Sequence, residues 1–215
     1  MPKTTLRYDI QSWLLKKFAH IKVFKYPLFI TYNPTTFKLK SDSYYAVRKL
    51  VKPGDILLRG YDSYLDGYCI PGLYSHAAIY VGWSPNGGSA ENEHIIHAMT
   101  PCVQYTDLVQ FMRCDRVCVV RPTVNPKLRD LAVTKAISKL NVPYDYDFVF
   151  DTDNPNDKDR LFSCSELVYY CYNHVLKQLG WRLHEKNYIC ISKKMFTPDN
   201  CLPVEGSASE IVWQG

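Results

Sequence analysis

The sequence predicts an α+β domain in which an antiparallel, barrel-like sheet of about five strands packs against helices. Five apolar runs, rich in β-branched and aromatic residues, follow one another between residues 56 and 121. Helical start signals come after them, near residues 125 and 163. Apolar residues make up 47% of the 215-residue chain, which is enough to build a core and excludes wholesale disorder. The length fits one domain with an extension.

The first 50 residues differ from the rest of the chain in their charge. Ten Lys and Arg stand there against Asp9 and Asp42, a local charge of +8, whereas the whole chain carries +5. Apolar residues recur at helical spacing and predict an amphipathic helix over residues 4–20: Ile10, Trp13, Leu14, Phe18 and Ile21. We expect this helix to dock on the core, and weak contact of the basic arm with an anionic surface is the alternative. We divide the chain into an N-terminal extension, residues 1–50, and a main domain, residues 51–215.

The strand region begins at a turn signal, Lys-Pro-Gly-Asp, at residues 52–55. The five predicted strands span residues 56–59, 76–83, 94–99, 103–106 and 117–121. Residues 84–89, Ser-Pro-Asn-Gly-Gly-Ser, form a loop by composition.

The first helix after the strands is predicted over residues 126–140. Asn125 is a preferred cap and Pro126 suits the first helical position, and apolar residues then recur at helical spacing. The acidic, Asn-rich residues 151–159 include the side-chain types that bind calcium, but they lack the Gly and Glu that an EF-hand loop needs at its sixth and twelfth positions. We interpret that segment as a loop.

Residues 163–166, Ser-Cys-Ser-Glu, carry the strongest functional signal. They form the S-x-x-E pattern of a capping box and lead into an apolar helical stripe. Cys164 is therefore predicted to be the first residue of a helix, where unpaired backbone N–H groups and the helix dipole favour a thiolate and lower the thiol pKa. This makes Cys164 a candidate nucleophile, although a cysteine here can also be a small buried apolar residue.

Two histidines are candidates for a general base. His76 begins one predicted strand and His97 lies within the next. Each alone is more often a hydrogen-bonded core histidine. Together with a cysteine at a helix start, they match the nucleophile, base and orienting residue of covalent catalysis.

Other functional classes find little support in the sequence. No phosphate-binding or dinucleotide-binding glycine motif is present, no nucleic-acid partner is expected, and His94, His97, Cys114 and Cys118 fit no zinc-finger spacing, so we expect neither cofactor nor metal. No apolar run is long enough to span a membrane, and the N-terminus lacks the features of a secretory signal. We expect a cytoplasmic protein whose eight cysteines are mostly reduced.

Five motifs together resemble the NlpC-type papain-like cysteine hydrolases. The residues that match lie at 53–57, 75–82, 95–98, 143–148 and 162–168. They correspond to the family's PGDLL, H-x-(A/G)-I-Y-x-G, IHA, PY and CS-x-LV patterns. In common members the cysteine helix precedes the strands, whereas here it follows them. This order is similar to that of the circularly permuted, YiiX-like branch, and the lipid-acting lecithin:retinol acyltransferase-like proteins are more distantly similar.

The resemblance implies a permuted papain-like catalytic domain and a role for each site residue. Cys164 would be the nucleophile, His76 the general base, and His97 the residue that orients His76. Tyr144, Ser75, Ser165 and Glu166 would lie in the substrate or oxyanion region. The permuted branch often has Glu in the third position, so Glu91, Glu93 and Glu166 are alternatives to His97.

The function that this resemblance implies is cleavage of an amide bond, in a peptide or cell-wall-type substrate, through an acyl-enzyme. One alternative is a thiol acyltransferase or esterase that acts on a lipid or another ester, with the basic arm at an anionic surface. The other is a small-molecule binding module that keeps the pocket without the chemistry. The expected partner is a peptide-like or acyl small molecule.

Overall fold

The computed structural model describes residues 10, 12–14, 21–24, 29–32, 37–62, 70, 72–83, 93–146, 161–188 and 191–215. A six-stranded sheet lies at its centre, and the strand order is β10-β7-β3-β4-β5-β6 with every neighbouring pair antiparallel. The strands are β3 (Ile56–Gly60), β4 (His76–Trp83), β5 (Glu93–Met99), β6 (Cys102–Asp107), β7 (Arg116–Pro122) and β10 (Ser209–Gln214).

All five predicted strands are confirmed, and the structure adds a sixth. Strand β10 pairs with β7 at the edge of the sheet, and a bulge interrupts its register between Ile211 and Trp213. Its side chains are exposed or half-buried, so its sequence lacks the run of buried apolar residues that marks β3 and β7. Two separate hairpins complete the strands: β1 (Ile21–Phe24) with β2 (Phe29–Tyr32), and β8 (His184–Tyr188) with β9 (Ile191–Met195).

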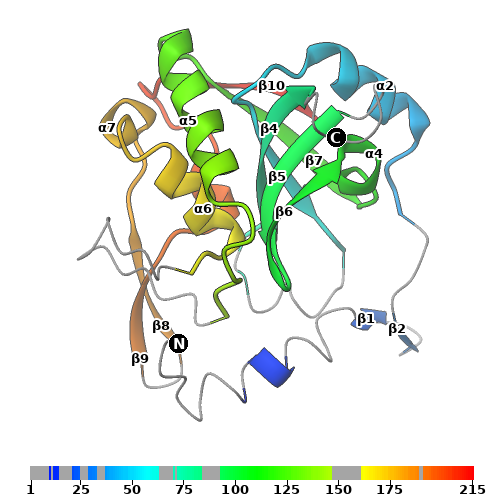
Figure 1. Cartoon of the computed structure of the whole chain (residues 1–215). Helices are drawn as coiled ribbons and strands as arrows, with labels where there is room; N and C mark the ends of the chain where they lie inside the picture. The colour runs from blue at the N-terminus through cyan, green and yellow to red at the C-terminus, as the bar shows by residue number, and fades with distance from the viewer. Residues whose placement is uncertain are drawn as a thin grey trace.

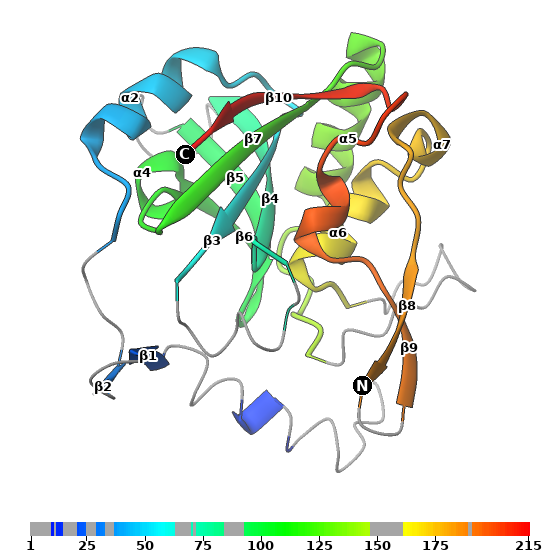
Figure 2. The same cartoon turned by 180° about the vertical axis from the view of Figure 1, so that it is seen from behind.

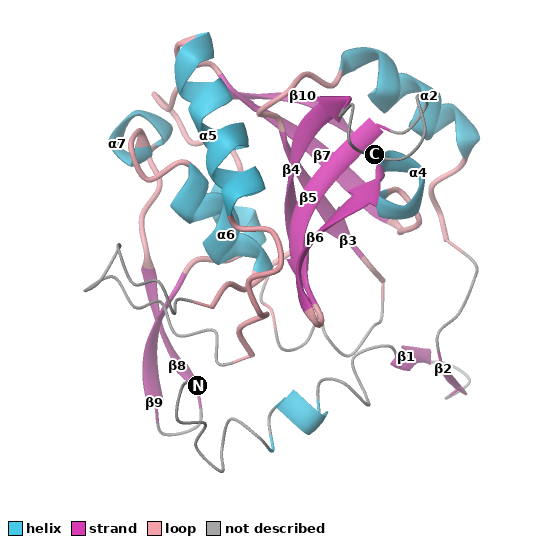
Figure 3. Ribbon diagram, in the orientation of Figure 1, coloured by secondary structure: helices cyan, strands magenta, loops and turns pink. Residues whose placement is uncertain are grey.

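Helices lie on both sides of the sheet. Helices α5 (Pro126–Ser138), α6 (Cys164–Cys171) and α7 (Leu176–Leu179) stand on one side, and α2 (Ser41–Leu50) and α4 (Leu108–Phe111) lie on the other, as the two opposite views show (Figure 1, Figure 2). The short 3₁₀ helix η1 (Pro198–Cys201) follows β9. Figure 3 shows the strongly curved sheet between the two helical groups.

Two apolar clusters hold these layers together because neighbouring strand residues point to opposite faces. Ala77 and Ile79 belong to the cluster that also contains Leu167 and Val168 of α6. Ala78 and Tyr80 belong to the cluster that contains Phe111 of α4. By this alternation, the side chain of His76 lies on the α4 face of the sheet.

The turn at residues 52–55 is fastened by an ion pair. The buried carboxylate of Asp55 accepts hydrogen bonds from Nε and Nη2 of Arg121 at 2.8 and 2.6 Å, and it also accepts one from the backbone N–H of Lys52 at 2.8 Å. Two parallel bonds between a guanidinium and a carboxylate fix geometry as well as charge. Asp55 therefore ties the start of β3 to β7.

Helix α5 begins as predicted, because Pro126 is its first residue and the side chain of Asn125 accepts from the backbone N–H of Lys127 at 3.0 Å. In the N-terminal extension, the described residues 10 and 12–14 are helical, but Ile10, Trp13 and Leu14 are exposed. The expectation that these side chains dock on the core is therefore wrong. The loops predicted at residues 84–89 and 151–159 lie outside the described residues.

No helix among the described residues is long and apolar enough to cross a membrane.

Candidate active site

Helix α6 begins with the capping box that the sequence predicts. The side chain of Ser163 accepts from the third residue of the helix, and Oε2 of Glu166 accepts from the backbone N–H of Ser163 at 2.8 Å. This reciprocal pair satisfies two of the N–H groups that a helix start leaves without intrahelical partners. Cys164 is consequently the first residue of α6, and its side chain is buried.

The two predicted histidines are in direct contact. Nε2 of His76 lies 2.9 Å from Nδ1 of His97, and the two rings meet edge to face, with centroids 5.0 Å apart. Both side chains are buried, and both rings pack against Phe111 of α4. Neighbouring strands β4 and β5 thus bring together residues that are separated by a loop in the sequence.

Cys164 approaches the histidines from the α6 side. The backbone N–H groups of Ala77 and Ser165 point at its sulfur, and both favour the thiolate. The thiol therefore lies beside the residue that follows His76. No hydrogen bond joins Cys164 to His76 in the described part of the chain, and catalytic hydrogen bonds often close only once substrate is bound.

Burial dominates the proton affinities of the site. It raises the pKa of Cys164 to about 11, although the two N–H groups and the charge of Arg59 act in the opposite direction. Burial, assisted by Arg59, lowers the pKa of His76 well below its usual value and that of His97 to about 3. The predicted low thiol pKa is therefore wrong for the free enzyme, which rests as a neutral thiol beside two neutral imidazoles.

The other predicted site residues surround Cys164. Burial raises the pKa of Tyr144, and Cys164 and Glu166 raise it further in their ionised forms, which places its phenol near both groups. The hydroxyl of Ser165 donates to the carbonyl of Phe196 at 2.5 Å. Ser75 is buried, and its hydroxyl has no hydrogen-bond partner among the described residues.

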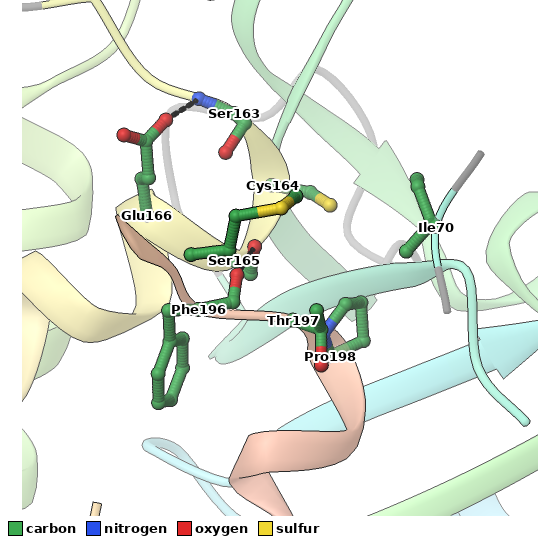
Figure 4. Close-up of a pocket in the computed structure, with 9 residues that line it drawn as sticks. Ile70, Ser163, Cys164, Ser165, Glu166, Phe196, Thr197 and Pro198 are labelled. Carbon is green, nitrogen blue, oxygen red and sulfur yellow. Dashed lines mark hydrogen bonds between the residues drawn. The ribbon is translucent and has the colours of Figure 1, made fainter. Parts of the chain in front are cut away.

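A narrow pocket opens beside Cys164 and has room for about one water molecule. It is lined by Ile70, by residues 163–166 at the start of α6, and by residues 195–198 between β9 and η1. Figure 4 shows these side chains around Cys164, with Glu166 turned back towards the backbone of Ser163.

Asp199 joins two walls of this pocket. Its carboxylate accepts from the backbone N–H groups of Leu73 and Tyr74 at 2.8 and 2.9 Å. These bonds link η1, which begins at Pro198, to the segment between Ile70 and His76. The sequence analysis did not identify Asp199, because nothing local distinguishes it from any acidic residue near a helix start.

The candidates for the residue that orients His76 differ in their hydrogen bonds. His97 is hydrogen-bonded to His76, whereas the carboxylate of Glu166 caps α6. Glu91 lies outside the described residues, as does the side chain of Glu93.

Two further residues of the site were not predicted from the sequence. Phe111 contacts the histidine pair, and Arg59 acts on it through charge. A signal for Arg59 was present, since a charged residue in a buried apolar run is unusual. No three His, Cys, Asp or Glu side chains gather closely enough to hold a metal ion within the described ranges.

Comparisons with known proteins agree with this geometry. The family model described as "permuted papain-like amidase enzyme, YaeF/YiiX, C92 family" matches residues 50–205. The crystal structure of the metalloprotein yiiX from Escherichia coli O157:H7 is similar with a TM-score of 0.59 and 17% sequence identity, over 77% of this chain and 98% of that chain. At this identity the likeness establishes the fold. No curated protein matches the chain.

Proposed function

Because the chain belongs to the family of permuted papain-like amidases, we propose that it cleaves amide bonds with Cys164 as nucleophile, His76 as general base and His97 as the orienting residue. The observation that carries this proposal is the 2.9 Å contact between His76 and His97. The residue after His76, Ala77, contacts the Cys164 thiol through its backbone N–H. Cys164, His76 and His97 come from α6, β4 and β5.

The hydrogen bond between the histidines defines the tautomer that catalysis needs. For His76 to act as base through Nδ1, its Nε2–H has to donate to the lone pair on Nδ1 of His97, which is one of the two directions that the 2.9 Å contact allows. Because the free thiol and both imidazoles rest neutral, proton transfer accompanies attack and does not precede it. This is general-base catalysis, in contrast to a preformed ion pair.

The reaction then proceeds in two halves. The Cys164 sulfur bonds to the substrate carbonyl carbon while His76 takes the thiol proton, and backbone N–H groups at the start of α6 hold the oxyanion. The imidazolium of His76 gives its proton to the leaving amine, and the C–N bond breaks to form a thioester. Water, deprotonated by His76, next attacks the thioester and releases the acid together with the free thiol. Tyr144, Ser75, Ser165 and Glu166 line the region around these steps.

A second candidate function is ester cleavage or acyl transfer from a lipid. Two observations favour it: the pocket lining includes the apolar side chains of Ile70, Met195, Phe196 and Pro198, and the helical residues Ile10, Trp13 and Leu14 of the basic extension are exposed. An apolar slot suits an acyl chain, and exposed apolar residues within a basic segment suit an anionic lipid surface.

One experiment tests both candidates. The full chain is incubated with N-acyl peptides, with matched acyl esters and with phosphatidylglycerol vesicles, and acyl-Cys164 is followed by intact mass and peptide mapping. We expect the amide series to be cleaved, with Cys164→Ala reducing turnover at least about 10³-fold. Cys171→Ala is the matched control, because Cys171 is also buried on α6, away from the pocket.

Each alternative outcome has a definite meaning. Preference for the esters or the vesicles replaces the amidase proposal with the lipid one. Full activity in Cys164→Ala rules out Cys164 as nucleophile. If the wild type forms no acyl-enzyme with any series, the pocket is a binding site without this chemistry.

A further inference from the structure

Arg59 is a buried cation at the active site. Only 6% of the residue is exposed, and it lies in the apolar strand β3 between Leu58 and Gly60. It pairs directly with His76 across the β3–β4 ladder. Directly opposed residues of antiparallel strands place their side chains on the same face of the sheet. The guanidinium therefore shares the α4 face with the catalytic histidines.

The contacts of Arg59 leave its charge without a partner. Nη1 donates to the carbonyl of Phe111 at 3.4 Å and Nη2 to the sulfur of Met99 at 3.6 Å, both long and uncharged contacts. The guanidinium lies over the rings of Phe111 and Tyr61, at 4.8 and 5.5 Å from their centroids. Its Nε has no hydrogen-bond partner, and no carboxylate pairs with it among the residues that the structure describes.

Two other arginines of the same sheet do have carboxylate partners. Arg121 pairs with Asp55, and Arg116 pairs with Asp62. Removing a charge from water without a compensating partner costs much more than removing a paired one. Because burying the unpaired guanidinium of Arg59 lowers the stability of the fold, its presence indicates a role other than stabilisation.

The groups that face this region come from four elements. His76 lies on β4, His97 on β5 and Cys164 on α6, while Cys114 and Asp115 immediately precede β7. The carboxylate of Asp115 accepts from the backbone N–H groups of Lys38 and Asp62, so it is held elsewhere. The guanidinium is thus a fixed charge that acts on all three proposed catalytic groups, whereas the carboxylate of Glu166 acts on Cys164 in the opposite direction.

We propose that Arg59 is a positioning residue that acts through its charge: it keeps His76 and His97 neutral, and it favours the thiolate of Cys164 as the substrate is attacked. This inference rests on the proposed roles of those three residues. The positive charge of Arg59 lowers the pKa of His76, His97 and Cys164, in each case alongside the larger effect of burial.

Two consequences for the reaction follow. A neutral His97 keeps the lone pair that receives the Nε2–H of His76, so the base stays oriented. Once His76 has taken the thiol proton, the nearby guanidinium makes the imidazolium a stronger acid, which speeds proton transfer to the leaving amine.

The experiment compares Arg59→Met, which removes the charge, with Arg59→Lys, which keeps it. Arg113→Met is the control, since Arg113 is an exposed arginine near the same helix α4. Two measurements need no substrate: histidine titration by NMR, and the rate of Cys164 alkylation by iodoacetamide as a function of pH. The third is thermal unfolding.

In Arg59→Met we expect the titration midpoints of His76 and His97 to rise, because protonation no longer meets a positive charge. Alkylation of Cys164 at pH 8 should slow about tenfold, because the thiolate loses a favourable neighbour. The melting temperature should stay the same or rise, because an unpaired buried charge has been replaced by an apolar side chain. Arg59→Lys and Arg113→Met should leave the midpoints and the alkylation rate near those of wild type.

The proposal is overturned if Arg59→Met folds with unchanged midpoints and alkylation. If Arg59→Met does not fold, the same measurements are made on Arg59→Gln. Failure of both variants to fold shows that Arg59 is structural and also overturns the proposal. None of these readouts uses turnover, so they remain interpretable if the amidase assay finds Cys164 inactive.

Discussion

Burial outweighs helix position in setting the state of the Cys164 thiol. A charge at a helix N-terminus gains about 0.3–1 kcal/mol, whereas taking a charged group out of water costs several times more. The start of α6 and the N–H groups of Ala77 and Ser165 therefore position the sulfur without ionising it in the free enzyme. In the proposed mechanism, activation comes from His76, whose tautomer depends on His97.

This dependence predicts that two substitutions of His97 differ in their effect on activity. His97→Leu removes the acceptor of the His76 proton and should lower kcat about 10²-fold with little change in KM, because His97 orients the base without touching the substrate. His97→Asn keeps a side-chain oxygen that can accept the same proton, and it should retain much more activity. Steady-state kinetics on the substrate found by the amide screen measures both.

His94→Asn is the matched control, because His94 is a second buried histidine on strand β5. Its kcat should stay close to that of wild type. Equal activity in His97→Leu and wild type would assign the orienting role to another group, and Glu93→Gln and Glu166→Gln would then be compared.

At the scale of secondary-structure elements, local patterns predicted much of what the structure contains. The capping box at Ser163 set the start of α6, and apolar runs rich in β-branched and aromatic residues located five strands. Strand β10 was missed because it lies at an edge with exposed side chains, and edge strands carry little apolar signal. The contacts of Arg59 and Asp199 depend on which strands and loops are neighbours, and no local pattern encodes that.

Asp199 illustrates how one such contact can control access to the site. Asp199→Ala removes two hydrogen bonds from a charged acceptor and should lower the free energy of unfolding by about 2 kcal/mol. It also frees the segment around Ile70 from the segment around Pro198, so alkylation of Cys164 at a fixed pH should become faster. Urea denaturation and mass spectrometry of the alkylated Cys164 peptide measure the two effects.

The control for Asp199→Ala is Glu205→Ala, which removes an exposed carboxylate from the segment after η1. Neither its stability nor its Cys164 reactivity should change. A destabilised Asp199→Ala protein with unaltered alkylation would show that this link supports the fold without closing the pocket.

At the scale of the whole molecule, the site is assembled from both faces of one sheet. The histidine pair sits among the apolar side chains of the α4 face, while the nucleophile comes from the helix on the other face. The layer that shields the histidines from water also holds the fold together. Protonation of the two histidines should therefore affect the stability of the whole fold as well as catalysis.

Acid should consequently destabilise the fold in a pH range set by these histidines. Unfolded histidines take up protons below about pH 6.5, whereas the folded His97 does so only near its pKa of about 3, and the pKa of His76 is also depressed. Between these limits the unfolded state binds more protons, so stability is fully present above pH 6.5 and decreases as the pH falls.

At pH 4.5 the loss of stability should reach about 2–3 kcal/mol for His97 alone. Urea denaturation at pH 7 and pH 4.5 should show a clearly smaller loss in His97→Asn, whereas His174→Gln should reduce the loss less, because burial also lowers the pKa of this half-buried histidine but to a smaller extent. An equal loss in His97→Asn and wild type would mean that other groups cause the acid sensitivity, and that His97 is not held neutral by the fold.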